Sequence, residues 1–180
     1  MTPDPTPPTS RPGRSRTDNA TDLGLVAGTV LRAARLSAGL SQAALATAAT
    51  VTPGIVRSWE NGSRPLASVP MPDVAQLEAA LRVHGADQQL IADLCAAAWC
   101  DLIILAVADH EDPTCLIADP VTSEVPFREL LTWSLTGLVP ARYRPYAAEQ
   151  PLVDPDLADR IMYVLDPIHP PLAAACLSAE

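Results

Sequence analysis

Arginine accounts for all twelve Lys-or-Arg residues of this 180-residue chain. A guanidinium donates paired hydrogen bonds to carboxylates, to phosphates and to the major-groove edge of guanine. Arg57 lies within the stretch SQAALATAATVTPGIVRSWENGSRP, residues 41–65. The stretch has the pattern of a short helix, a tight turn and a second helix ended by glycine, which is a layout that lays a helix against DNA. For Arg57, a base contact and a phosphate or solvent-exposed role both remain open.

Cysteine and histidine are the candidates for metal or redox chemistry. Cys95, Cys100, His110 and Cys115 are close in sequence, but no Cys-x-x-Cys spacing is present. On a helix, Cys95 and Cys100 point about 140° apart. We therefore predict no metal site and no cofactor, and we expect the cysteines to be buried, reduced thiols. A redox switch is the weaker alternative.

The remaining polar residues form no catalytic pattern. The sequence has no Ser/His/Asp order, no glycine-rich phosphate loop and no HExxH motif, so an enzyme is not expected. The stretches RELLTW, residues 128–133, and RYRPY, residues 142–146, place aromatic side chains beside arginines. They fit either a groove for a ligand or peptide, or core aromatics with arginines that extend to the surface.

Charge and composition divide the chain into three parts. Residues 1–21 are rich in Pro, Thr, Ser and Arg without an apolar stretch, which predicts a disordered arm and not a secretory signal. Residues 22–84 have a net charge of +1, whereas residues 85–180 carry four arginines against fifteen carboxylates. The longest apolar run, residues 102–108, is much shorter than the roughly 20 residues that span a bilayer. A cytoplasmic protein without membrane contact is therefore expected. The lack of lysine, the many alanines and the 19 prolines indicate a high-GC bacterial genome.

Apolar periodicity predicts an all-α fold. The expected helices span residues 23–38, 42–49, 52–61, 73–83, 86–107, 124–136 and 156–165. Ser41 and Thr52 are suitable N-caps, while Gly39 and Gly62 end the helices before them. The segment 86–107 is one long helix or a bent pair, and a short extended piece is expected at residues 115–118.

The stretch LRAARLSAGLSQAALATAATVTPGIVRSWENGSRP, together with its flanks over about residues 25–84, resembles the helix-turn-helix of the lambda-repressor-like group, the XRE family. The resemblance implies that the third helix enters the major groove of double-stranded DNA. It also implies that Arg35 and Glu60 form a structural ion pair and that Gln42 meets a phosphate. The candidate DNA-binding residues are Arg32, Gln42, Thr52, Pro53, Gly54, Ile55, Arg57, Ser58, Asn61 and Arg64.

Two positions depart from the family pattern. Thr50 occupies a turn position that usually holds glycine, where a positive φ is unfavourable for other residues. Pro53 and Gly54 occupy the first two exposed positions of the third helix, and neither side chain has a donor or acceptor for a base edge. Direct base readout should therefore be limited, with dimer spacing and DNA shape supplying much of the specificity.

The predicted organisation is an arm, residues 1–21, a DNA-binding domain, residues 22–84, and a helical dimerisation or regulatory region, residues 85–180. The expected function is a dimeric, sequence-specific transcriptional regulator that acts as a repressor, with an unidentified small-molecule or protein effector. The homodimer interface is placed on the long apolar helix at Leu94, Ala98, Leu102 and Ile103, because the remaining elements look too short to cover it. The alternative is a protein-interaction module that uses a degenerate helix-turn-helix and the acidic helical region to bind another regulator.

Overall fold

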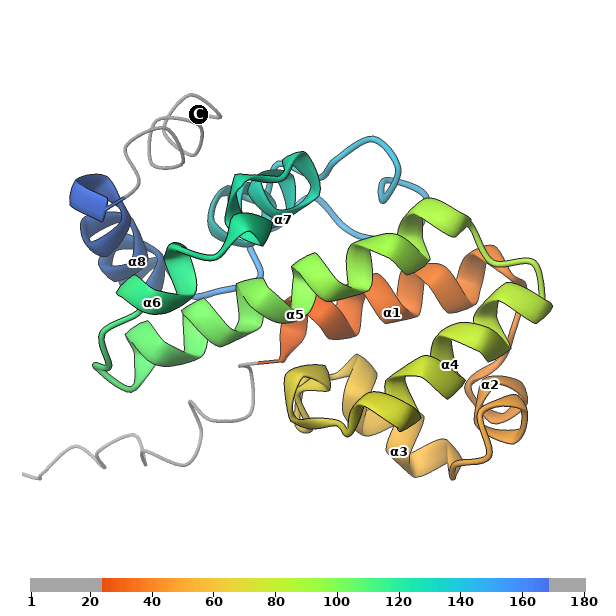
Figure 1. The fold of residues 1–180 in the computed structure, drawn as a ribbon. Coiled ribbons are helices and arrows are strands. Elements are labelled where there is room, and N and C mark those ends of the chain that lie inside the picture. The colour runs from red at the N-terminus through yellow and green to blue at the C-terminus, as the bar shows by residue number, and fades with distance from the viewer. Residues whose placement is uncertain (1–23, 169–180) are drawn as a thin grey trace, which may run out of the picture.

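The computed structural model describes residues 24–168, and within this range it contains α-helices and 3-10 turns but no strand. Figure 1 shows the arrangement. The all-α prediction is confirmed, and each of the seven predicted helices is present. The α-helices are α1 (Leu25–Ser37), α2 (Gln42–Ala48), α3 (Pro53–Glu60), α4 (Met71–Val83), α5 (Gln88–Ala108), α6 (Thr114–Ile117), α7 (Val125–Thr136) and α8 (Pro155–Ile168).

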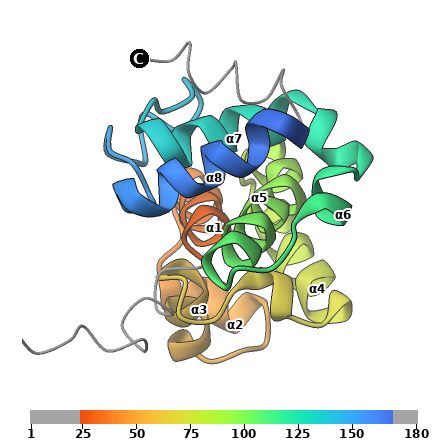
Figure 2. The same ribbon diagram turned by 90° about the vertical axis from the view of Figure 1, so that its left-hand side faces the viewer.

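Helix α5 is the central element of the fold. It runs beside α1, with α2, α3 and α4 on one side of this pair and α7 and α8 on the other (Figures 1 and 2). Its apolar side chains join those of α1, α3, α7 and α8 in one continuous core. The proposed boundary between residues 84 and 85 stays a prediction, and α5 packs against the helices on both sides of it.

Helix α5 is one continuous helix, where the sequence had left a bent pair open. As a single helix of 21 residues it meets the length and composition of a membrane span, although 67% of the relevant window is buried inside the protein. Its two carboxylates, Asp93 and Asp101, are also buried, and both accept hydrogen bonds. These features are those of the core helix of a folded domain, in which buried charges are partnered.

The predicted dimer interface on α5 is wrong for two of its four residues. Leu94 is 4% exposed and Ile103 is 0% exposed, because the same chain covers them. Ala98 and Leu102 are partly buried, and Ala98 packs against the core. Helices α1, α7 and α8 cover α5 more completely than their short lengths suggested. A second subunit is therefore not needed to bury this helix.

Two further predictions about the second half of the chain need correction. Residues 114–117 form the short helix α6 where an extended piece was expected, and Pro120–Ser123 forms a 3-10 turn.

Cys100 is buried as predicted, but Cys95 and Cys115 are exposed, whereas Cys176 lies outside the described residues. The pKa of the Cys95 thiol is raised by partial burial and by the carboxylates of Glu124, Glu78 and Asp119, which disfavours its reactive thiolate. No metal-binding cluster occurs within residues 24–168.

Candidate nucleic-acid interface

Helices α2 and α3 are joined by a tight turn whose residues set the geometry of the motif. The Ser41 hydroxyl caps α2 by accepting from the Ala44 amide at 3.1 Å. Thr50 has φ +57°, so the turn adopts the left-handed backbone that its missing glycine would favour. The Thr52 hydroxyl accepts from the Ile55 amide at 3.4 Å, and Pro53 occupies the first turn of α3, where its missing N–H costs little.

A glycine contact positions α3 against α1, and sequence reasoning missed it. A Cβ on Gly28 would lie 2.5 Å from the carbonyl oxygen of Trp59, and one on Gly24 would lie 2.8 Å from that of Gly62. Both distances are too short for any side chain, so the two backbones can approach this closely only with glycine at these positions. The Gly-x-x-x-Gly spacing of Gly24 and Gly28 is the signal that would have found this contact.

The Arg35–Glu60 pair fixes α3 more firmly. Arg35 Nε donates to Glu60 Oε1 at 2.5 Å and its Nη2 donates to Oε2 at 3.1 Å, with side-chain exposures of 8% and 5%. The remaining guanidinium nitrogen, Nη1, donates to the carbonyl of Leu40 at 2.7 Å. This bidentate geometry joins the end of α3 to α1 and to the α1–α2 loop.

Gln42 belongs to the same network. Its Nε2 donates to Glu60 Oε2 at 2.7 Å, so one amide hydrogen is already used inside the protein. A side-chain amide has two N–H donors, which leaves the second for a phosphate. Glu60 thus holds the first residue of α2 together with α1 and α3.

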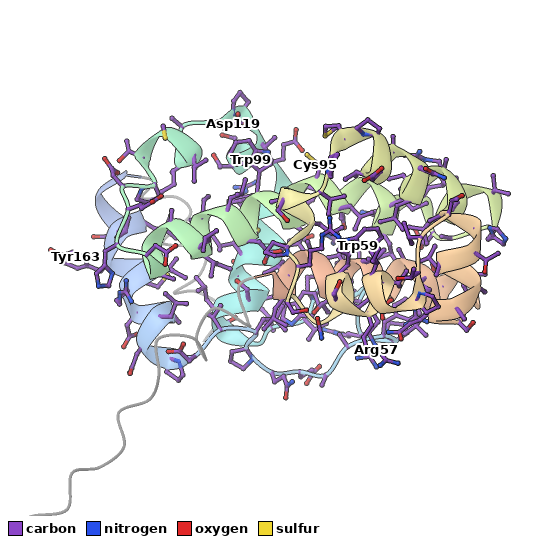
Figure 3. The ribbon with its side chains drawn as sticks, turned by 90° about the horizontal axis from the view of Figure 1, so that it is seen from below. Arg57, Trp59, Cys95, Trp99, Asp119 and Tyr163 are labelled. Atoms are coloured by element: carbon purple, nitrogen blue, oxygen red, sulfur yellow. The ribbon has the colours of Figure 1, made fainter. Side chains whose placement is uncertain are left out.

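Fewer residues of α3 are exposed than the sequence predicted. Pro53, Gly54 and Arg57 are exposed, and Figure 3 shows Arg57 at the edge of the molecule with Trp59 in its interior. Ile55, predicted to be exposed, is half-buried and packs against the core. Ser58 is also half-buried, and its hydroxyl donates to the carbonyl of Ile55 at 2.7 Å.

The other predicted contact residues surround α3. Asn61 is exposed, and its Oδ1 accepts from the amide and the hydroxyl of Ser63 at 3.1 and 2.7 Å, which shapes the loop after α3. Arg64 follows in the same loop and is exposed, as is Arg32 on α1. Thr52 is exposed but already serves as the helix cap.

The arginines of residues 24–168 fall into two groups. Four have side-chain partners in this range, namely Arg35, Arg82, Arg142 and Arg160. The side chains of the other five make no hydrogen bond or ion pair in the same range, and three of these, Arg32, Arg57 and Arg64, come from the α1–α3 region. Unpaired guanidinium groups beside an exposed helix face suit contact with phosphates and base edges.

Comparison with known proteins agrees with this geometry. Residues 26–94 match a family model described as a helix-turn-helix domain. No curated protein and no solved structure matches the chain significantly. The match begins in α1 and ends within α5, so it contains the network around Glu60 and the whole exposed face of α3. Residues 26–94 are therefore a helix-turn-helix domain, consistent with a DNA-binding regulator of the XRE type.

Proposed function

We propose that this chain is a sequence-specific DNA-binding repressor that acts in the cytoplasm as a homodimer. The observation that carries the proposal is the contrast within α3. Glu60 at its end is held by Arg35 and Gln42, while Arg57 on its exposed face has no partner within residues 24–168. A helix held in this way presents its guanidinium to a major groove without first giving up an internal bond.

Dimerisation follows from the small number of possible base contacts. Pro53 and Gly54 offer no side-chain hydrogen bonds, and Ser58 bonds to its own helix, which leaves Arg57 as the main candidate reader. Two coupled copies on a palindromic site raise the affinity without any new contact within one half-site. Repression is proposed because a protein that occupies a promoter excludes other proteins from that DNA.

The test is binding of the full-length protein to genomic DNA fragments, followed by a salt titration on the selected site. We expect selection of a palindromic sequence, a steep loss of affinity with salt and two chains per site by light scattering. Arg57→Ala should weaken binding to the selected site by about 1–3 kcal/mol, whereas Arg82→Ala, which removes an exposed arginine of α4 paired with Glu78, should leave it unchanged.

The second candidate is a protein-interaction module, which the Pro53–Gly54 pair favours because it deprives α3 of side-chain donors at its first turn. In that case the protein would select no DNA sequence, and any binding to fragments would be weak and equal for all of them. A monomer without sequence selection would replace the repressor proposal by this one.

A further inference from the structure

The acidic region after residue 84 contains two arginines that are not used by the fold. Arg142 pairs with Asp93 and Glu129, and Arg160 donates to the last carbonyls of α5. The side chains of Arg128 and Arg144 make no hydrogen bond or ion pair within residues 24–168, although fifteen carboxylates lie in this part of the sequence. Both guanidinium groups are therefore available to a ligand from outside the protein.

Arg128 and Arg144 line the same cavity. It has a volume of about 360 Å³ and lies between α7 and the loop that follows it. The rest of its lining is mostly apolar, from Val125, Leu138, Val139, Pro140 and Ala141. Val125 and Leu138 are 56% and 53% exposed, so two large apolar side chains face solvent here. The one carboxylate in the lining, Glu129, is paired with Arg142 and does not neutralise the two free arginines.

A buried hydrogen-bond network holds the loop that lines the cavity. Asp93 on α5 is 2% exposed and accepts from Arg142 Nε at 2.6 Å and from the Tyr143 hydroxyl at 2.7 Å. Tyr143 also packs on Trp133 of α7, with 5.2 Å between ring centroids. These contacts hold the loop directly after Ala141 against α5 and α7, which favours a preformed cavity, as small-molecule sites usually are.

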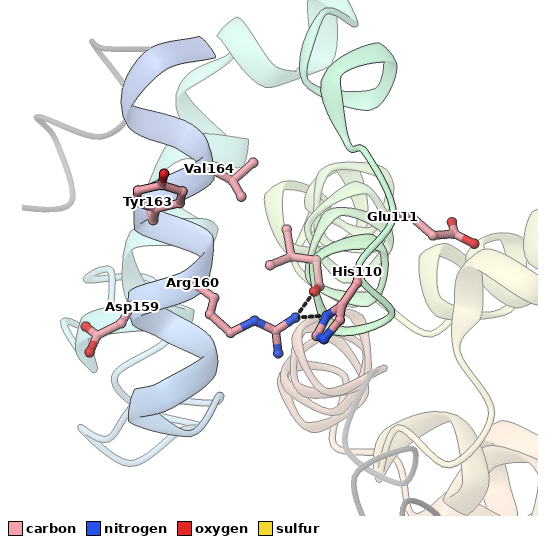
Figure 4. A pocket seen from close by; sticks show the side chains of 7 residues that line it. His110, Glu111, Asp159, Arg160, Tyr163 and Val164 are labelled. Carbon is pink, nitrogen blue, oxygen red and sulfur yellow. Dashed lines mark hydrogen bonds between the residues drawn. The ribbon is translucent and has the colours of Figure 1, made fainter.

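In the other large cavity, Arg160 has a structural role. It has a volume of about 410 Å³ and lies between α8 and the end of α5. Figure 4 shows Arg160 reaching across it to the carbonyl of Val107 and to His110, with 2.5 Å between Arg160 Nη2 and His110 Nδ1. Its guanidinium therefore caps α5 and is not available to a ligand.

We propose that the cavity beside α7 binds a small organic anion with an apolar body, held by Arg128 and Arg144. Its volume lies within the range of about 300–1,000 Å³ that is typical of ligand sites. The apolar part of the lining favours a ligand with an apolar body, and the two guanidinium groups favour a carboxylate or a similar head group. DNA held by α3 is not the occupant, because α7 lies on the opposite side of the α1–α5 pair (Figures 1 and 2).

The test uses octanoate as the probe and isothermal titration calorimetry with the full-length protein in the absence of DNA. Octan-1-ol and octylamine match its apolar body and replace the anionic head with a neutral or a cationic one. We expect octanoate to bind more tightly than either. The double variant Arg128→Gln/Arg144→Gln should bind octanoate about tenfold more weakly or worse. The matched control Arg82→Gln, which removes an exposed arginine of α4, should bind it as the native chain does.

A second variant tests the apolar half of the site. Leu138→Asp adds a negative charge at an exposed position of the lining, so it should weaken octanoate binding while the circular dichroism spectrum stays native. Equal binding of octanoate by the native chain and the double variant would overturn the proposal. So would octan-1-ol binding as tightly as octanoate, or the absence of any binding heat.

Discussion

The two ends of the fold each contain a carboxylate that holds a neighbouring arginine. Near α3, the Glu60 carboxylate, 5% exposed, holds Arg35 and Gln42, while Arg57 has no partner among the described residues. Near α7, buried Asp93 holds Arg142 and Tyr143, while Arg128 and Arg144 have no side-chain partner within residues 24–168. The free arginines differ in their surroundings, because Arg57 projects from a helix face whereas the other two line an apolar cavity. The proposed nucleic-acid contact and the proposed small-molecule site are thus distinguished by the local apolar surface more than by the number of arginines.

The largest expected effect comes from the network beside α7. Asp93→Ala leaves the Arg142 guanidinium and the buried Tyr143 hydroxyl without their shared acceptor. Removing one partner of a buried pair costs about 3–5 kcal/mol, so urea unfolding should show a loss near the upper end. Glu149→Ala, at an exposed loop position, is the control and should change little. A loss below about 1 kcal/mol would mean that the Asp93 network does not stabilise the fold as the Glu60 network is expected to.

Glu60→Ala should have the next largest effect. It strips Arg35 of its bidentate partner, but Arg35 keeps its bond to the Leu40 carbonyl, so we expect a loss of about 3 kcal/mol in urea unfolding. Glu78→Ala removes the exposed partner of Arg82 and serves as the control, with an expected loss of less than about 1 kcal/mol. If both variants unfold alike, the pair at Glu60 does not stabilise the fold.

Arg57→Ala should separate binding from stability. Its side chain has no partner within residues 24–168, so the unfolding free energy should stay within about 0.5 kcal/mol of the native value. A lost guanine contact should weaken binding to the selected site by about 1–3 kcal/mol, measured by fluorescence anisotropy. Unchanged affinity would remove Arg57 from the readers.

A further effect, which depends on pH, concerns the carboxylate that joins α5 to the start of α1. Asp101 on α5 accepts from the amides of Val26 and Ala27 at 3.0 Å each, and burial raises its pKa to about 7 although these two bonds oppose the shift. Because the folded-state pKa lies above the unfolded one, the stability from this group is full below about pH 4 and is lost as the pH rises through 7.

The Asp101→Asn variant does not titrate at this position. The native chain should therefore lose stability relative to this variant between about pH 5 and pH 7, with parallel curves above about pH 8. Urea unfolding of both proteins across this range measures the difference. Parallel curves over the whole range would show that Asp101 is already ionised at pH 5.

Sequence patterns predicted the helices and the α3 region well because local rules decide them. Caps at Ser41 and Thr52 and the stop at Gly62 depend on residues within a few positions of each other. Long-range contacts were not predictable in this way. The cover over Leu94 and Ile103 comes from helices that no periodicity assigns to α5, and the partner of Arg142 lies 49 residues away at Asp93. The half-burial of Ile55 likewise depends on how α3 is tilted against the core.

The bond between Asp101 and the start of α1 also bears on how such a protein can be divided. The match to the helix-turn-helix family model ends at residue 94, before Asp101. The first amides of α1 nevertheless depend on that carboxylate, since helix N-termini need acceptors for their free N–H groups. The matched segment therefore lacks an acceptor that its own first helix uses, and transplanting residues 26–94 onto another chain would require a substitute acceptor for Val26 and Ala27.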